Sequence, residues 1–387
     1  MREVLNNVRV LDLTRLLPGD YCTMLLSDFG ADIIKIEEPT KGDYIRDIPP
    51  FTNGYSVLHV SVNRNKKSMT LNLKSRKGVT IFNRLARDSD VIVEGFRPGV
   101  VKRLGIDYRS VRRIKPDIIY CSITGYGQTG PYRKLVGHDI NYCSIGGLLG
   151  LSLQKPPSLI GTQIADLVGG GIFAATAILL ALISRNRTGK GQYIDTSMVD
   201  GIVSLCSPHL LSKLIETEDS AHSMLSGDFP CYNVYKTRDD QYFSIGAVED
   251  KFWRNLCTQI GKQDFAKHQW TADKKRSEIF TYLSSALAQK TRKQLFHQLS
   301  QHDISVGPVY TSKEVFGDPQ INHRKLLLRT KHRKATLNHV RNPMRLSLTP
   351  ARIKRAPPTL GQHTNQILAA IGYTKRDIQR FRDKKIL

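Results

Sequence analysis

The first 130 residues alternate strand-like and helix-like segments, and this alternation restricts the fold more than any other feature of the chain. The expected strands are residues 8–13, 32–36, 68–73, 90–94 and 117–123, and the expected helices are residues 18–29, 75–88, 100–104 and 108–114. Strands that alternate with helices predict a parallel sheet in an α/β domain. In such sheets, ligands bind at the carboxyl ends of the strands.

The pattern changes near Gly227. Residues 165–215 are expected to be rich in helix, with a strand at 192–196. Two further strands, 231–236 and 242–248, joined at Asp239-Asp240, predict a hairpin. Helices are expected at 251–260, 277–288 and 291–300, a strand at 344–348, and a last helix behind a capping box at Thr374. The second half therefore contains a smaller α+β domain.

The chain has 387 residues, which is enough for about two domains. Its net charge of +24 first suggests nucleic acid as a partner. The charge is spread along the chain, however, and we find no helix-turn-helix, zinc-finger or aromatic-basic RNA motif. A small polyanionic ligand, such as a phosphorylated cofactor, explains the charge better, and binding to nucleic acid is the remote alternative.

Cysteine spacing and hydropathy restrict the kinds of site that the protein can contain and the compartment in which we expect it. Six scattered cysteines without a C-x-x-C pair argue against a metal site and a disulfide scaffold, so we expect a reducing, cytoplasmic compartment. The longest nearly apolar run, residues 172–183, has 12 residues, whereas a membrane span needs roughly 20. We expect a buried core helix and no membrane partner.

Two ionisable residues, His138 and Asp166, stand 28 positions apart in unusual surroundings. His138 belongs to a polar cluster after a glycine-rich loop. Asp166 precedes three glycines and the apolar helix, whose first N–H groups could hold an oxyanion. A histidine and a carboxylate in one pocket could transfer protons. The alternatives are a structural histidine and an aspartate that serves as an N-cap.

Other polar residues carry weaker signals. The segment 125–130 matches G-x-G-x-x-G, but no helix and no suitable acid follow, so we reject a nicotinamide site. Glu249 ends the second hairpin strand, where an ordinary loop acid is the alternative. Four cations near strand ends could bind phosphates, although each could equally be a surface charge. They are Arg46, Lys74, Arg97 and Arg103.

A series of motifs, taken in order, resembles the class III CoA-transferase (CaiB/BaiF) superfamily, and within it the α-methylacyl-CoA racemases. The motifs span most of the chain: Val10-Leu11-Asp12-Leu13, Leu17-Pro18-Gly19, residues 26–32, 63–68, 71–74 and 94–99, Thr124-Gly125-Tyr126-Gly127, residues 188–192 and residues 357–364. Such an ordered series is specific for the superfamily and less specific for the reaction.

The resemblance implies a chemical role for three residues. Asp166 matches the acid that attacks the acyl-CoA thioester in the transferases. In the racemases that acid works with a histidine, matched by His138, and the two exchange the α-proton through an enolate. Glu249 matches a glutamate of the small domain that supports the histidine. Many transferases lack the histidine, so we expect a 2-methylacyl-CoA racemase of lipid metabolism, with a CoA-transferase as the alternative.

The resemblance also implies the architecture and the CoA contacts. We expect a large Rossmann-like domain at 1–215, a small α+β domain at 226–325, and a return linker with the C-terminal part of the large domain at 326–387. Two subunits would interlock as a homodimer, with Glu249 serving His138 across the dimer. CoA is expected as substrate, with no permanent cofactor. Its expected contacts are Arg46, Leu71, Asn72, Leu73, Lys74, Gly95, Phe96, Arg97, Arg103, Gly137, Asp139 and Tyr142.

Overall fold

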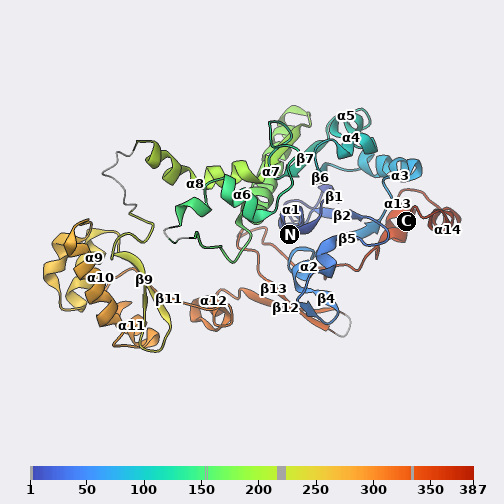
Figure 1. Ribbon diagram of the computed structural model, residues 1–387. Coiled ribbons are helices and arrows are strands. Elements are labelled where there is room, and N and C mark those ends of the chain that lie inside the picture. Colours follow the sequence, from blue (N-terminus) through green and yellow to red (C-terminus); the bar gives the residue numbers. More distant parts are fainter. Residues whose placement is uncertain (1–2, 153, 155, 216–223, 333–334) are drawn as a thin grey trace. The chain divides into compact units, whose positions relative to one another are not determined.

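A computed structural model describes residues 3–152, 154, 156–215, 224–332 and 335–387 (Figure 1). The chain divides into two compact units: the described residues of 1–148, 159–207 and 325–387 belong to the first, and those of 149–158 and 208–324 to the second.

The first unit is built on a six-stranded sheet in which every pair of neighbouring strands is parallel. The strands are β1 (Arg9–Leu13), β2 (Asp32–Glu37), β5 (Lys67–Thr70), β6 (Val91–Glu94), β7 (Ile119–Thr124) and β8 (Tyr193–Ser197). Their order is β5-β2-β1-β6-β7-β8, the doubly wound order of Rossmann folds. The expected α/β class is confirmed.

Two apolar clusters fill the two faces of this sheet, because successive strand residues point to opposite sides. One joins Val10 and Ile33 to α1 (Leu16–Asp28) and α7 (Phe173–Thr188). The other joins Leu11 and Ile34 to α3 (Arg76–Arg87), α13 (Thr364–Ala370) and α14 (Lys375–Asp383). The C-terminal helices therefore complete the first unit.

α7 continues a π-helix, η3 (Ala165–Ile172), and together they form a helical stretch of 24 residues with a mean hydropathy of 2.2. By length and composition this stretch could cross a membrane, but the core helix of a soluble protein meets the same two criteria. It is longer than the apolar run seen in the sequence. Its contacts with α1, β7 and β8 are those of a core helix.

The second unit contains an antiparallel sheet in the order β11-β10-β9, and the expected hairpin is its β9–β10 pair. Its elements are β9 (Tyr232–Lys236), β10 (Tyr242–Gly246), β11 (Val306–Val309), α9 (Asp250–Gln259), α10 (Lys274–Leu287) and α11 (Arg292–Leu299). Trp253 and Phe243, both fully buried, lie in its core.

One expected strand is wrong. Residues 344–348 form no strand, and Leu348 is 72% exposed, so an extended segment here has no apolar face to bury. The chain instead forms a hairpin earlier, from β12 (Leu327–His332) and β13 (Ala335–Val340).

Candidate active site

The strand order reverses between β1 and β6, and the carboxyl ends of these strands border a hollow of about 620 Å³. Thr14 follows β1 and Phe96 and Arg97 follow β6, and all three line it. His138 and Asp166 line the same hollow. The structure therefore brings the two ionisable residues to the crevice where α/β sheets bind ligands.

Asp166 lies inside η3, one residue beyond its start. Its N–H donates to Asp139 Oδ1 at 3.0 Å, and the Leu167 N–H donates to the Gln163 carbonyl at 3.0 Å. These two donors therefore have protein partners, and the oxyanion role expected for N–H groups of this helix stays a prediction. Asp166 is not the N-cap, because Ile164 holds that position.

The glycines after Asp166 serve packing between helices. A Cβ on Gly169 would lie 2.7 Å from the Met198 carbonyl oxygen, and one on Gly170 would lie 2.8 Å from Pro18 Cβ. Both glycines are buried. The missing side chains let η3 approach α1 and the start of α8 (Met198–Ile215).

The carboxyl group of Asp166 has a pKa above the usual range of aspartate. Burial, and then the charge of Asp139, raise its pKa to about 7. Both causes disfavour the ionised form. The group is therefore poised to accept or donate a proton near neutral pH, which suits a general acid and base.

His138 lies directly before α6 (Asp139–Ile145), and its ring is exposed to the hollow. The backbone N–H of His138 donates to Asn141 Oδ1 at 3.0 Å, and this bond fixes the turn into the helix. The Tyr142 hydroxyl donates to the Gly137 carbonyl at 2.6 Å. A Cβ on Gly125 would lie 2.3 Å from Tyr142 Cε1, so that position requires glycine.

Leu16, the first residue of α1, also lines the hollow. It has a φ of 62°, and its N–H donates to Asp43 Oδ1 at 3.0 Å. Asp43 is held in turn by Lys35, whose Nζ lies 2.8 Å from Asp43 Oδ2 and 2.5 Å from Asp20 Oδ1. These three charged side chains are buried, and their pairing offsets the cost of removing them from water. The buried cluster thus fixes one wall of the hollow.

Most of the expected CoA contacts gather in this hollow and an adjoining one of about 240 Å³. The two share Thr14, Arg15 and Phe96. The larger one is lined by Gly95, Phe96, Arg97, Gly137 and Tyr142, and the smaller one by Leu71, Asn72, Leu73, Lys74 and Phe96. These segments follow β5, β6 and β7; β6 and β7 are neighbours in the sheet, whereas β2 and β1 lie between β5 and β6.

Three expected contacts lie elsewhere. The Arg46 guanidinium pairs with both Glu37 oxygens, at 2.7 and 2.8 Å, which gives it a structural role. Asp139 holds the Asp166 backbone and lines neither hollow. Arg103 lines a third hollow. The CoA contacts expected of Arg46, Asp139 and Arg103 therefore stay predictions.

Glu249 belongs to the second unit, immediately before α9, and its side chain is exposed. Its side chain does not cap that helix. The expected support of His138 by Glu249 thus stays a prediction.

Arg15 lines both hollows and was not among the site residues predicted from the sequence. Its guanidinium lies 5.0 Å from the centre of the Tyr44 ring and donates to the Tyr44 hydroxyl at 2.9 Å. Arg15 lies two residues beyond the end of β1, and this place at a strand end, which it shares with Arg97, is the signal that could have identified it.

Comparison with known proteins agrees with this geometry. The family model for CoA-transferase family III matches residues 5–364. Succinyl-CoA:glutarate CoA-transferase of Homo sapiens is 33% identical, covering 99% of this chain and 87% of that protein. Alpha-methylacyl-CoA racemase of Homo sapiens is 31% identical, covering 99% and 97%. A crystal structure of a CAIB/BAIF family protein from Brucella suis matches with a TM-score of 0.83 and 30% identity, covering 96% and 100%.

Proposed function

The chain belongs to CoA-transferase family III, and from this premise we propose that it exchanges the α-proton of a 2-methylacyl-CoA and so acts as a racemase. The observation that carries the proposal is that His138 and Asp166 line one hollow. The pKa of Asp166, raised to about 7, supports proton transfer at neutral pH. The similarity to racemases of Homo sapiens and Mus musculus supports it further.

The proposed reaction has two proton transfers. The ionised Asp166 takes the α-proton, and the electron pair of the broken C–H bond moves to the thioester oxygen to form an enolate. The protonated His138 then returns a proton to the other face of the α-carbon, which inverts it. In the opposite direction the two side chains exchange roles. The pair holds one proton in total at the start and at the end.

Exchange in heavy water tests the proposal directly. The enzyme should introduce deuterium at the α-carbon of a 2-methylacyl-CoA, and both His138→Ala and Asp166→Asn should slow this by about 100-fold or more. His297→Ala, which replaces an exposed histidine of α11, is the matched control and should exchange normally. An active parent enzyme that transfers CoA but exchanges no α-proton would contradict the proposal.

The second candidate is CoA transfer, favoured by the names of several relatives, including the human and mouse succinyl-CoA:glutarate CoA-transferases. In that reaction the Asp166 carboxylate attacks the thioester carbonyl, CoA leaves as the thiolate, and an acyl anhydride remains. Hydroxylamine would trap that anhydride at Asp166. Because this route needs no second proton-transfer group, His138→Ala would retain transfer activity.

We also propose that the active form is a homodimer in which Glu249 supports His138. Apolar side chains exposed on α7 and α8, among them Leu180 at 63% and Leu205 at 43%, support association. Sedimentation should give twice the monomer mass, and a monomeric enzyme with full activity would contradict the assembly.

A further inference from the structure

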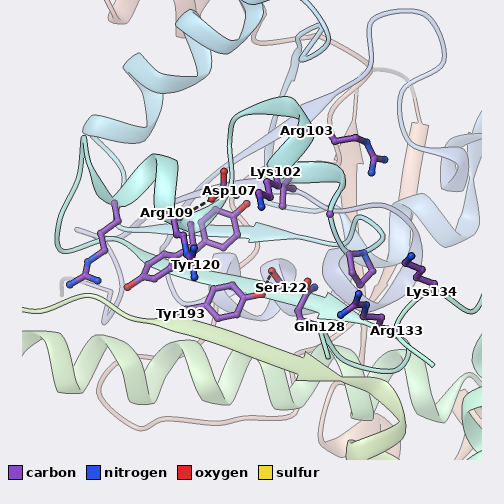
Figure 2. Close-up of a pocket in the computed structure, with 15 residues that line it drawn as sticks. Lys102, Arg103, Asp107, Arg109, Tyr120, Ser122, Gln128, Arg133, Lys134 and Tyr193 are labelled. Carbon is purple, nitrogen blue, oxygen red and sulfur yellow. Dashed lines mark hydrogen bonds between the residues drawn. The ribbon is translucent and has the colours of Figure 1, made fainter. Parts of the chain in front are cut away.

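A third hollow, of about 1010 Å³, lies on the first unit and is lined by neither His138 nor Asp166 (Figure 2). It is bordered by α4 (Val100–Leu104), α5 (Tyr108–Arg112) and the strands β7 and β8. It shares only Pro98 and Arg133 with the hollow of His138 and Asp166. We call it the basic–tyrosine hollow.

Its lining is strongly cationic. The six basic residues are Lys102, Arg103, Arg109, Arg112, Arg133 and Lys134. The one carboxylate, Asp107, caps α5: it accepts the Arg109 N–H at 3.0 Å and the Ser110 hydroxyl at 2.7 Å. In the described part of the chain, none of the six cations forms an ion pair. Their mutual repulsion favours a ligand with several negative charges.

Three tyrosines form an aromatic wall between these cations. The rings of Tyr108 and Tyr193 lie 5.5 Å apart, and those of Tyr120 and Tyr193 stack at 6.1 Å. Tyr120 is buried, whereas Tyr193 is 39% exposed and offers part of its ring to the hollow. Figure 2 shows Arg133 and Lys134 at one end of the hollow and Tyr120 and Arg109 toward the other. Such a wall can stack a flat heterocycle beside its charged groups.

A polar side chain of the same hollow is unsatisfied. Gln128 Nε2 is buried, and no described residue accepts a hydrogen bond from it. Nearby, the Tyr193 hydroxyl donates to Ser122 Oγ at 3.0 Å, and Ser122 donates to Glu94. A buried amide donor without a partner is costly in a folded protein, and a ligand acceptor would satisfy it.

We propose that the basic–tyrosine hollow binds a phosphorylated nucleotide as a second ligand beside the acyl-CoA. The base stacks on the tyrosine wall, and the phosphates contact the cations. The volume suits a single nucleotide. Because Arg133 also lines the hollow of His138 and Asp166, occupancy of one site can influence the other.

Calorimetry with ADP, in the presence of saturating acetyl-CoA, tests this site. Acetyl-CoA occupies the substrate hollow, so ADP that still binds, with one site per chain, reports the second hollow. Arg109→Ala/Arg112→Ala should weaken this binding at least about tenfold. The control Lys375→Ala/Arg376→Ala removes two exposed charges on α14 and should leave it unchanged.

The aromatic wall has its own test. Tyr193→Ala should weaken ADP binding about tenfold but leave the binding of inorganic pyrophosphate unchanged, and Tyr193→Phe should bind ADP normally. Three results would overturn the proposal: complete displacement of ADP by acetyl-CoA, equal losses in the control variant, or tighter binding of oligoadenylate than of ADP with several chains per strand. The first would assign the hollow to the nucleotide end of CoA, and the last to nucleic acid.

Discussion

Asp166 owes its raised pKa to burial and to the neighbouring Asp139, which also holds the Asp166 backbone in place. In a two-base exchange, kcat/KM for either enantiomer follows a bell-shaped pH profile, because the His138–Asp166 pair must hold one proton. Asp139→Asn keeps an oxygen that can accept the Asp166 N–H but removes the charge. We expect the profile to move to lower pH by less than about one unit, since burial remains.

The measurement is kcat/KM against pH for both enantiomers. Asp264→Asn, a charge change in the second unit, is the control and should leave the profile in place. A profile that stays fixed in Asp139→Asn would show that the Asp139 charge does not reach the reacting pair.

Glu94 is a second buried carboxyl group, and burial raises its pKa to about 7. A folded pKa above the ordinary value of 4.5 means that the folded state binds the proton more tightly than the unfolded state does. Protonated Glu94 therefore adds about 3 kcal/mol to the free energy of unfolding. This contribution is complete below about pH 4.5 and is lost as the pH rises through about 7. Glu94→Gln should therefore flatten the fall in stability between pH 5 and 8, measured by urea denaturation.

Glu37 is also a buried carboxyl group, but its pKa is shifted in the opposite direction from that of Glu94. Burial disfavours its charge, but Arg46 and Lys35 outweigh burial and lower its pKa to about 2. Glu37→Gln should consequently weaken stability at pH 7, where the charged form contributes fully. If both variants changed stability in the same way with pH, burial of Glu94 would not govern its titration.

At the scale of elements, the sequence predicted what local composition determines. Strands β1, β2, β6 and β7 lie within three residues of their expected limits, because parallel strands buried on both faces read as apolar runs. The π-helix η3 was not predicted, and its close packing against Met198, far along the chain, is a contact that local sequence does not reveal. The hairpin β12–β13 was missed for the same reason: its strands gain their partners through tertiary pairing.

The candidate site shows the same division. Motifs identified Asp166, His138 and Phe96, and strand ends identified Arg97, all of which line one hollow. Local sequence did not reveal that Arg46 is engaged by Glu37, because that ion pair depends on the fold.

The packing of η3 on α8 leads to a further prediction. Gly169→Ala places a Cβ 2.7 Å from the Met198 carbonyl oxygen, a backbone atom that cannot turn aside. We expect a loss of about 1–3 kcal/mol and a Tm lower by several degrees. Gly161→Ala, where no atom lies within 4 Å of the added Cβ, is the control and should leave the Tm unchanged. Equal stability of the two variants would contradict tight packing at η3.

At the scale of the whole molecule, the net charge of +24 should attract an anionic substrate before it binds. Raising the ionic strength screens that attraction, so kcat/KM for an acyl-CoA should fall several-fold between about 0.05 and 0.5 M salt while kcat changes little. The comparison substrate is the same acyl group on N-acetylcysteamine, which lacks the phosphates of CoA. Its kcat/KM should depend only weakly on salt. Parallel losses for both substrates would indicate that salt acts on the protein itself, and the diffuse charge would then have no role in capturing CoA.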